Sequence, residues 1–158
     1  HNEIHHKSKK NKIECVRQIA INGFGIADLV SVSWESKKNV NKSMVSIEEF
    51  LSIYKPTIRA FEIKLNNWRR GLTQAHRYRY FANAAILVLP IERNSIALEH
   101  IETFKKIHVG LWSFDSASKR IFAHFTPRPT LAIEAKHMKR SIQIMANTSR
   151  ALPIVRRR

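Results

Sequence analysis

The sequence predicts an α/β fold in which a mixed central sheet is flanked by helices. The stretch Thr57–Pro90 carries the clearest signal, because an apolar run, a segment with helical period and a second apolar run follow one another. Continuous apolar runs are typical of parallel strands, and the helix between two such strands makes a right-handed crossover. A chain of 158 residues can bury a substantial core, so we expect residues 1–158 to form a single domain.

Two strands are expected before this unit. Residues Ile13–Ile21 alternate between apolar and polar side chains, Asn22–Gly25 has the composition of a hairpin turn, and the apolar run Ile26–Trp34 follows it. The polar stretch His1–Lys12 predicts a frayed or partial helix. Residues 35–56 predict an insertion between strands, with a polar loop and one short helix that starts with a capping-box pattern.

From Thr57 onward, helices and strands are expected to alternate. The central helix, Trp68–Ala82, lies between the strands Thr57–Leu65 and Ala84–Pro90. The later elements are expected at Ser95–Lys106 (a helix), Val109–Asp115 and Arg120–Phe125 (two strands joined by a turn) and 130–158 (a helix from Thr130 to about Arg150, then a basic tail).

The charge of the chain indicates a polyanionic partner. Lys and Arg total 28 against 12 acidic residues, which gives a formal net charge of +16. Such an excess predicts nucleic acid binding, with DNA as the expected partner and RNA left open, and a merely solvated basic surface is the alternative. No apolar run reaches the length of a membrane span and no secretory signal is visible, so we expect a cytoplasmic protein without membrane contact. The single cysteine, Cys15, excludes an internal disulfide, and its apolar neighbours predict a buried thiol.

Three charged residues stand in otherwise apolar strands. Glu62 and Lys64 are two positions apart, so their side chains point to the same face of the expected strand. Asp28 interrupts the apolar run of the earlier strand. Burying an unpaired carboxylate costs several kcal/mol, so each acidic group needs a partner, which is either a metal ion or an ion pair.

The same residues resemble the motif of the PD-(D/E)xK nuclease superfamily. An Asp on one strand, a Glu-x-Lys at the end of the next and a Gln-x-x-x-Tyr on the following helix are similar to the branch that contains the RecB-type exonuclease domains and the CRISPR adaptation nucleases. The motif residues are Asp28, Glu62, Lys64, Gln74 and Tyr78. The resemblance covers Ile13–Phe125 and implies a restriction-endonuclease-like αβββαβ core with an extra C-terminal helix. Ala27 stands where the family usually has Pro.

The resemblance also implies a chemistry, namely Mg²⁺-dependent hydrolysis of DNA phosphodiester bonds with Mn²⁺ as a substitute. Asp28, Glu62 and the backbone carbonyl of Ile63 would bind the metal through oxygen, which hard cations prefer. Lys64 would orient the attacking water or stabilise charge on the phosphoryl oxygens. Restriction, repair or mobile-element biology would be the setting.

The expected central helix combines two motif residues with a basic surface. By resemblance, Gln74 holds the attacking water or a metal-bound water, and Tyr78 orients Gln74 or contacts the phosphate. Interleaved basic and aromatic side chains suit phosphate contact and base stacking, although an ordinary amphipathic helix with a solvated basic face explains them equally well. The candidate nucleic-acid-binding residues are Arg69, Arg70, Arg77 and Arg79.

Two other classes of function stay open beside a nuclease. One is a nucleic-acid-binding module with an idle site, and the other is an interaction protein in which Asp28, Glu62 and Lys64 form a buried ion network; a homodimer or a larger complex is compatible with each. A second Glu-x-Lys, Glu134-Ala-Lys136, falls in the expected last helix, where residues two apart point in different directions. We therefore expect that copy to form no site.

Overall fold

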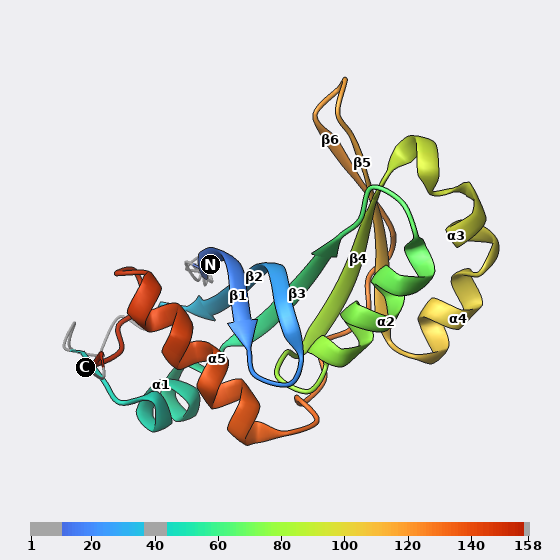
Figure 1. Cartoon of the computed structure of the whole chain (residues 1–158). Coiled ribbons are helices and arrows are strands. Elements are labelled where there is room, and N and C mark those ends of the chain that lie inside the picture. Colours follow the sequence, from blue (N-terminus) through green and yellow to red (C-terminus); the bar gives the residue numbers. More distant parts are fainter. Residues whose placement is uncertain (1–10, 37–43, 157–158) are drawn as a thin grey trace, which may run out of the picture.

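A computed structural model describes residues 11–36 and 44–156, and six strands in it form one mixed sheet in the order β1-β2-β3-β4-β5-β6 (Figure 1). The strands are β1 (Asn11–Ile21), β2 (Gly25–Glu35), β3 (Thr57–Ile63), β4 (Ala84–Pro90), β5 (Val109–Asp115) and β6 (Arg120–Phe125). Neighbouring strands run antiparallel from β1 to β3, parallel from β3 to β5, and antiparallel between β5 and β6. The predicted α/β class and mixed sheet are confirmed.

The described helices all lie against one face of this sheet. They are α1 (Ile47–Tyr54), α2 (Trp68–Tyr78), α3 (Ser95–Glu99), α4 (Ile101–Lys106) and α5 (Ala135–Thr148), with a short 3₁₀ helix at Ile91–Arg93. Val30 and Ala60, which pair across β2 and β3, belong to a cluster with residues of α1 and α5. Leu87 and Leu111, which pair across β4 and β5 on the same face, contact residues of α2 and α4. Figure 1 shows α5 with α1 beside it near β1 and β2, and α2, α3 and α4 near β4 and β5.

The opposite face of the sheet carries a small apolar cluster of its own. Phe61, Ile86 and Val88 are buried there, with the partly buried Trp112 and Phe114 beside them. The rings of Phe61 and Trp112 have centroids 5.5 Å apart. Within the part of the chain that the structure describes, no helix residue belongs to this cluster.

Several element boundaries differ from the expectation. The central helix ends at Tyr78 rather than Ala82. The helix expected at Ser95–Lys106 is divided at His100 into α3 and α4. The last helix begins at Ala135 rather than Thr130, because the preceding residues bond to the chain after α2: the Ile133 amide, for example, donates to the carbonyl of Arg79. The expected helix at 1–12 lies outside the described residues except for Asn11 and Lys12, which belong to β1.

The insertion and the C-terminal segment form a joint piece of the core. Val45 and Ile154 make a parallel bridge, and both side chains are buried. The capping box at the start of α1 is present, since the Ser46 hydroxyl accepts from the Glu49 amide and the Glu49 carboxylate from the Ser46 amide. The expected basic tail therefore contributes apolar contacts before its arginines, of which Arg157 and Arg158 lie outside the described residues.

None of the helices in the described ranges has the length and apolar character that crossing a membrane requires.

Candidate active site

The two candidate carboxylates lie side by side although they are far apart in the sequence. The β2–β3 ladder ends with Leu29 opposite Phe61, so Asp28 and Glu62 are the next residues in register on adjacent strands. Asp28 Oδ2 accepts a hydrogen bond of 2.7 Å from the Ile63 amide. The carboxylate thus takes the place of a backbone acceptor where the two strands stop pairing, and this bond fixes its position beside the end of β3.

Glu62 is buried, with 1% of its surface exposed, and both of its oxygens have partners. Oε1 lies 2.6 Å from Lys64 Nζ, and Oε2 accepts from the Tyr78 hydroxyl. That hydroxyl also lies 2.8 Å from the carbonyl oxygen of Ile26, but its single proton serves one acceptor at a time. A buried carboxylate held by an ammonium and a hydroxyl fulfils the expectation that each such charge needs a partner.

Tyr78 remains a hydrogen-bond donor at neutral pH. Burial raises the pKa of its hydroxyl far above the usual range, and the hydrogen bond to Glu62 and the negative charges of Glu62 and Asp28 raise it further. A phenol with such a pKa does not act as a base. The contacts of the Tyr78 hydroxyl are with Glu62 and the Ile26 carbonyl, and the roles toward Gln74 or a phosphate that the resemblance implies stay predictions.

Gln74 contributes an unsatisfied acceptor to the same region. It lies one helical turn before Tyr78 on α2, and its Oε1 is buried without a hydrogen-bond partner among the described residues. An orphaned buried acceptor costs about 1–3 kcal/mol, so it indicates a donor that the chain itself does not supply. A water molecule bound at the site would be such a donor.

Gly71 allows the helix to approach the site, and sequence reasoning missed it. A Cβ atom at this position would lie 2.6 Å from Leu87 Cδ1 and 2.8 Å from Lys64 Cγ. The absence of a side chain lets α2 lie close to β4 and lets the Lys64 stem cross the helix toward Glu62. The available signal was a glycine inside a helical pattern, which costs about 1 kcal/mol relative to alanine and so needs a packing reason.

Gln18 on β1 has a strained backbone and lies opposite Asp28 in the register of β1 and β2, which the sequence did not predict. Gln18 has a φ of +51°, which costs a residue with a side chain roughly 1–2 kcal/mol. Val16 and Ile19 are both buried, so the alternation of β1 shifts by one residue at Gln18; β2 shifts likewise between Ala27 and Val30. The shift puts Cys15 on the exposed side, so the expected burial of its thiol is wrong.

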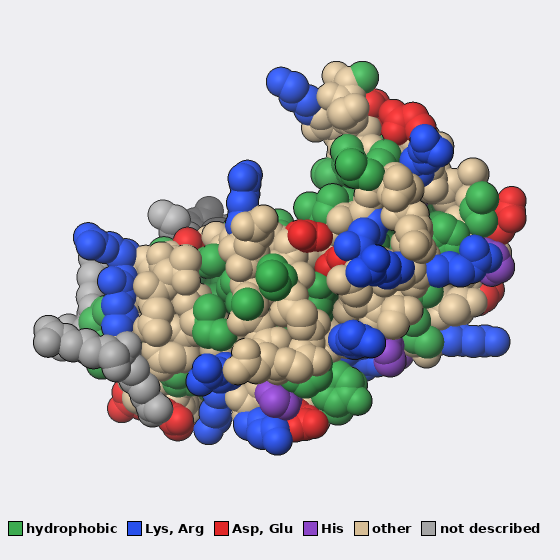
Figure 2. Space-filling model, viewed as in Figure 1, with side chains coloured by type: hydrophobic (Ala, Val, Ile, Leu, Met, Phe, Trp, Pro, Cys, Tyr) green, Lys and Arg blue, Asp and Glu red, His purple; other side chains and the backbone are tan. Residues whose placement is uncertain are grey.

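The arginines of α2 differ in their surroundings. Arg69, Arg70 and Arg77 are exposed, and the Arg69 guanidinium lies 4.7 Å from the centroid of the Trp68 ring. Arg79 instead donates a 3.2 Å hydrogen bond to the carbonyl of Ile107, which ties the end of α2 to the turn before β5. Figure 2 shows basic side chains over α2, beside acidic ones near the hollow below the β5–β6 hairpin.

The second Glu-x-Lys is an exposed ion pair. Lys136 Nζ lies 3.2 Å from Glu134 Oε2, and the two side chains are 74% and 39% exposed. The expectation that these side chains point apart is wrong, because Glu134 precedes the helix in an extended conformation. Its exposure nevertheless separates it from the buried pair.

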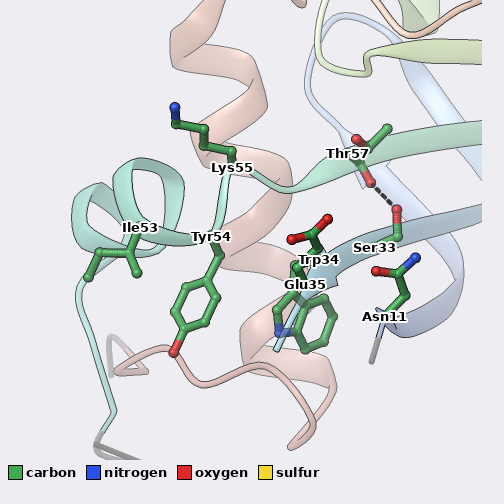
Figure 3. A pocket seen from close by; sticks show the side chains of 8 residues that line it. All are labelled: Asn11, Ser33, Trp34, Glu35, Ile53, Tyr54, Lys55 and Thr57. Carbon is green, nitrogen blue, oxygen red and sulfur yellow. Dashed lines mark hydrogen bonds between the residues drawn. The ribbon is translucent and has the colours of Figure 1, made fainter. Parts of the chain in front are cut away.

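Another hollow, of about 440 Å³, lies at the opposite end of β2 and β3 (Figure 3). Tyr54 and Lys55, at the end of α1, form one wall of it, and Trp34 lies opposite. The Ser33 hydroxyl donates a 3.4 Å hydrogen bond to the Thr57 carbonyl at its edge. None of the motif residues lines this hollow.

The site offers oxygen ligands in small number. In residues 11–36 and 44–156, no group of three or more His, Cys, Asp and Glu side chains is arranged to hold a metal ion. Asp28 and Glu62 with the orphaned Gln74 oxygen are hard donors, and with Lys64 the two carboxylates leave one net negative charge. The donor set therefore fits a hard divalent cation whose remaining ligands are backbone carbonyls and water.

Comparison with protein-family models, curated proteins and solved structures finds no match for the chain.

Proposed function

We propose that the chain is a metal-dependent nuclease of the PD-(D/E)xK type that hydrolyses phosphodiester bonds of DNA. The observation that carries the proposal is the buried Glu62, held by Lys64 and Tyr78 next to Asp28. A pair of carboxylates with an ammonium, at the ends of adjacent strands in a chain of net charge +16, suits a substrate of phosphates.

The strand arrangement supports the finer fold assignment. Apart from the insertion with α1 between β2 and β3, three antiparallel strands, the helix α2 and a strand parallel to the third follow one another from β1 to β4. This is the order that a restriction-endonuclease-like αβββαβ core requires after its first helix.

Asp28, Glu62 and the carbonyl of Ile63 would hold Mg²⁺, for which Mn²⁺ could substitute. A metal bound there lowers the pKa of a bound water and neutralises phosphoryl charge. Lys64 would stabilise the charge that develops on the phosphoryl oxygens. The Lys64 side chain is 27% exposed, against 2% for Glu62, so it forms the surface end of the network, within reach of a substrate.

The residues of α2 would act on either side of this centre. Tyr78 donates to Glu62 and holds its carboxylate in place. The free oxygen of Gln74 can accept a hydrogen bond from the attacking water and so orient it. The exposed Arg69, Arg70 and Arg77 would contact substrate phosphates, whereas Arg79 mainly stabilises the end of the helix.

Cleavage of supercoiled plasmid and of linear duplex, with Mg²⁺, Mn²⁺ or EDTA, tests the proposal. We expect metal-dependent cutting that falls by about 100-fold or more in Glu62→Gln, which keeps the shape of the side chain. Glu134→Gln is the matched control and should cut normally. Equal cutting by wild type and Glu62→Gln, with both folded by circular dichroism, would refute the assignment.

A second candidate is favoured by the completeness of the Glu62 network. Both of its oxygens are already satisfied by Lys64 and Tyr78, as in a structural ion network on a nucleic-acid-binding module. Calorimetric titration with Mn²⁺ separates the two functions. Binding that disappears in Asp28→Asn supports the nuclease, and absence of binding with retained DNA affinity supports the module.

A further inference from the structure

A hollow of about 610 Å³ borders the candidate site and is lined by residues from three strands. Arg17 and Gln18 come from β1, Asp28 and Leu29 from β2, and Ile63 from β3. Asp28 and Ile63 also belong to the candidate site, where the carboxylate accepts from the amide. The hollow therefore opens directly beside the Asp28 carboxylate, and its volume is in the range of sites that hold a small ligand group.

The strained backbone of β1 brings a cation to this hollow. Arg17 pairs directly with Leu29, and the left-handed Gln18 faces the register position of Asp28. At this point the alternation of buried and exposed side chains shifts by one residue in both β1 and β2. Arg17, just before the shift, and Asp28, within it, therefore line the same cavity. Backbone strain of this kind is concentrated at functional sites.

The Arg17 guanidinium is available for a ligand. It is exposed, and no hydrogen bond or ion pair joins it to another residue in the part of the chain that the structure describes. The planar fork of a guanidinium matches the oxygens of a phosphate, which it can bind through two hydrogen bonds. Asp28 would repel an anion by itself, so a phosphate fits this hollow when a cation balances the carboxylate.

We propose that Arg17 binds a phosphodiester group of the substrate strand, next to the phosphodiester group that is cleaved. The inference rests on the proposed function, since the cation at Asp28 is the one that the nuclease requires. The substrate strand would then be held from two sides, by the arginines of α2 and by β1, across the ends of β2 and β3. Arg17 lies on β1, outside the helix α2 that carries the predicted nucleic-acid-binding arginines. It therefore gives the substrate strand a second place of contact with the protein.

The salt dependence of DNA binding tests this contact. Fluorescence anisotropy with a labelled duplex, in Ca²⁺ and in EDTA between about 50 and 200 mM salt, gives the slope of log K against log salt. In Ca²⁺, Arg17→Ala should lower the slope by about 0.9 and the affinity roughly 5-fold. Arg17→Lys keeps the charge and should keep the slope. Arg140→Ala, an equal charge change at an exposed position of α5, is the control and should leave the slope unchanged.

The outcomes distinguish this inference from the proposed function. An unchanged slope in Arg17→Ala, or an equal loss in Arg140→Ala, would overturn the Arg17 contact even if the wild type cuts DNA. A wild type that neither cuts nor responds to divalent ions would overturn the nuclease. A slope lowered by Arg17→Ala alone would still support a phosphate contact at that residue.

Discussion

The chain contains the tripeptide pattern Glu-x-Lys twice, and the two copies make different structures. Glu62 projects from β3 on the helix-covered face, where it is 1% exposed and its carboxylate also accepts from Tyr78, and Lys64 follows directly after the strand. Glu134 and Lys136 stand at the start of α5 in solvent. Both pairs are within ion-pair distance, at 2.6 and 3.2 Å. Glu134 also has a second partner, since His137 Nε2 lies 3.3 Å from its Oε2. Burial, rather than the motif, the pairing or the number of partners, therefore distinguishes the candidate site from a surface ion pair.

Removal of the lysine should separate the two copies most strongly. Lys64→Met leaves Glu62 buried without a cation, so we expect the free energy of unfolding to fall by about 3 kcal/mol. Lys136→Met removes an exposed partner and should change it by about 0.5 kcal/mol or less. Urea unfolding at neutral pH measures both. Similar losses for the two variants would show that the buried pair has no special weight.

The tyrosine of the buried copy should give it a distinct response to alkaline pH. Its pKa is raised in the folded state, so above pH 10 the unfolded chain loses this proton while the folded chain keeps it. Stability should then fall with rising pH, by up to about 1.4 kcal/mol per pH unit from this group. Tyr78→Phe should remove that contribution. Urea unfolding of wild type and variant between pH 8 and 11.5 checks it, and parallel curves for the two would contradict it.

A methyl group at Gly71 should disturb the buried copy alone. Gly71→Ala drives a Cβ atom into Leu87 and the Lys64 stem, which we expect to outweigh the gain in helix propensity and destabilise by about 1–2 kcal/mol. Thr73→Ala, exposed on the same helix, should stay within about 0.5 kcal/mol of wild type. Thermal unfolding followed by circular dichroism compares them. If Gly71→Ala were instead stabilised, the Lys64 side chain could move away from α2 without a loss in the free energy of unfolding.

The smallest effect is expected from relief of strain beside the buried copy. Gln18→Gly should raise the free energy of unfolding by about 0.5–1 kcal/mol, because glycine adopts a positive φ freely. Gln18→Val should instead lower it, since a branched side chain opposes that backbone. Urea titration of both variants decides the sign, and a destabilised glycine variant would indicate that the Gln18 side chain itself is needed.

The sequence was sufficient for the elements with sharp boundaries. The strands Ala84–Pro90, Val109–Asp115 and Arg120–Phe125 occur with the predicted limits, because turn residues or a proline stand at their ends. The terminal helix starts later than predicted, since its first residues bond to the backbone after α2 rather than to one another. Such tertiary bonds leave no mark in local periodicity.

The candidate site was predictable as a set of residues but not as an arrangement. The apolar surroundings of Asp28 and Glu62 showed that each carboxylate needed a partner. Their placement in register across β2 and β3 depends on pairing between distant segments, and the shift at Gln18 depends on a backbone angle that its side chain does not favour. Gly71 was the one supporting residue with a visible signal.

The one-sided arrangement of the helices turns Cys15 into a native chemical reporter. Cys15 pairs with Ser31 across β1 and β2, so its side chain belongs to the sheet face opposite the described helices, and it is the single thiol of the chain. Although Cys15 is exposed, desolvation by its neighbours and then the negative charge of Glu14 raise the pKa of its thiol, so alkylation should be slow at neutral pH and faster in alkaline buffer. The labelling rate of unmodified protein therefore measures how accessible that face is in solution.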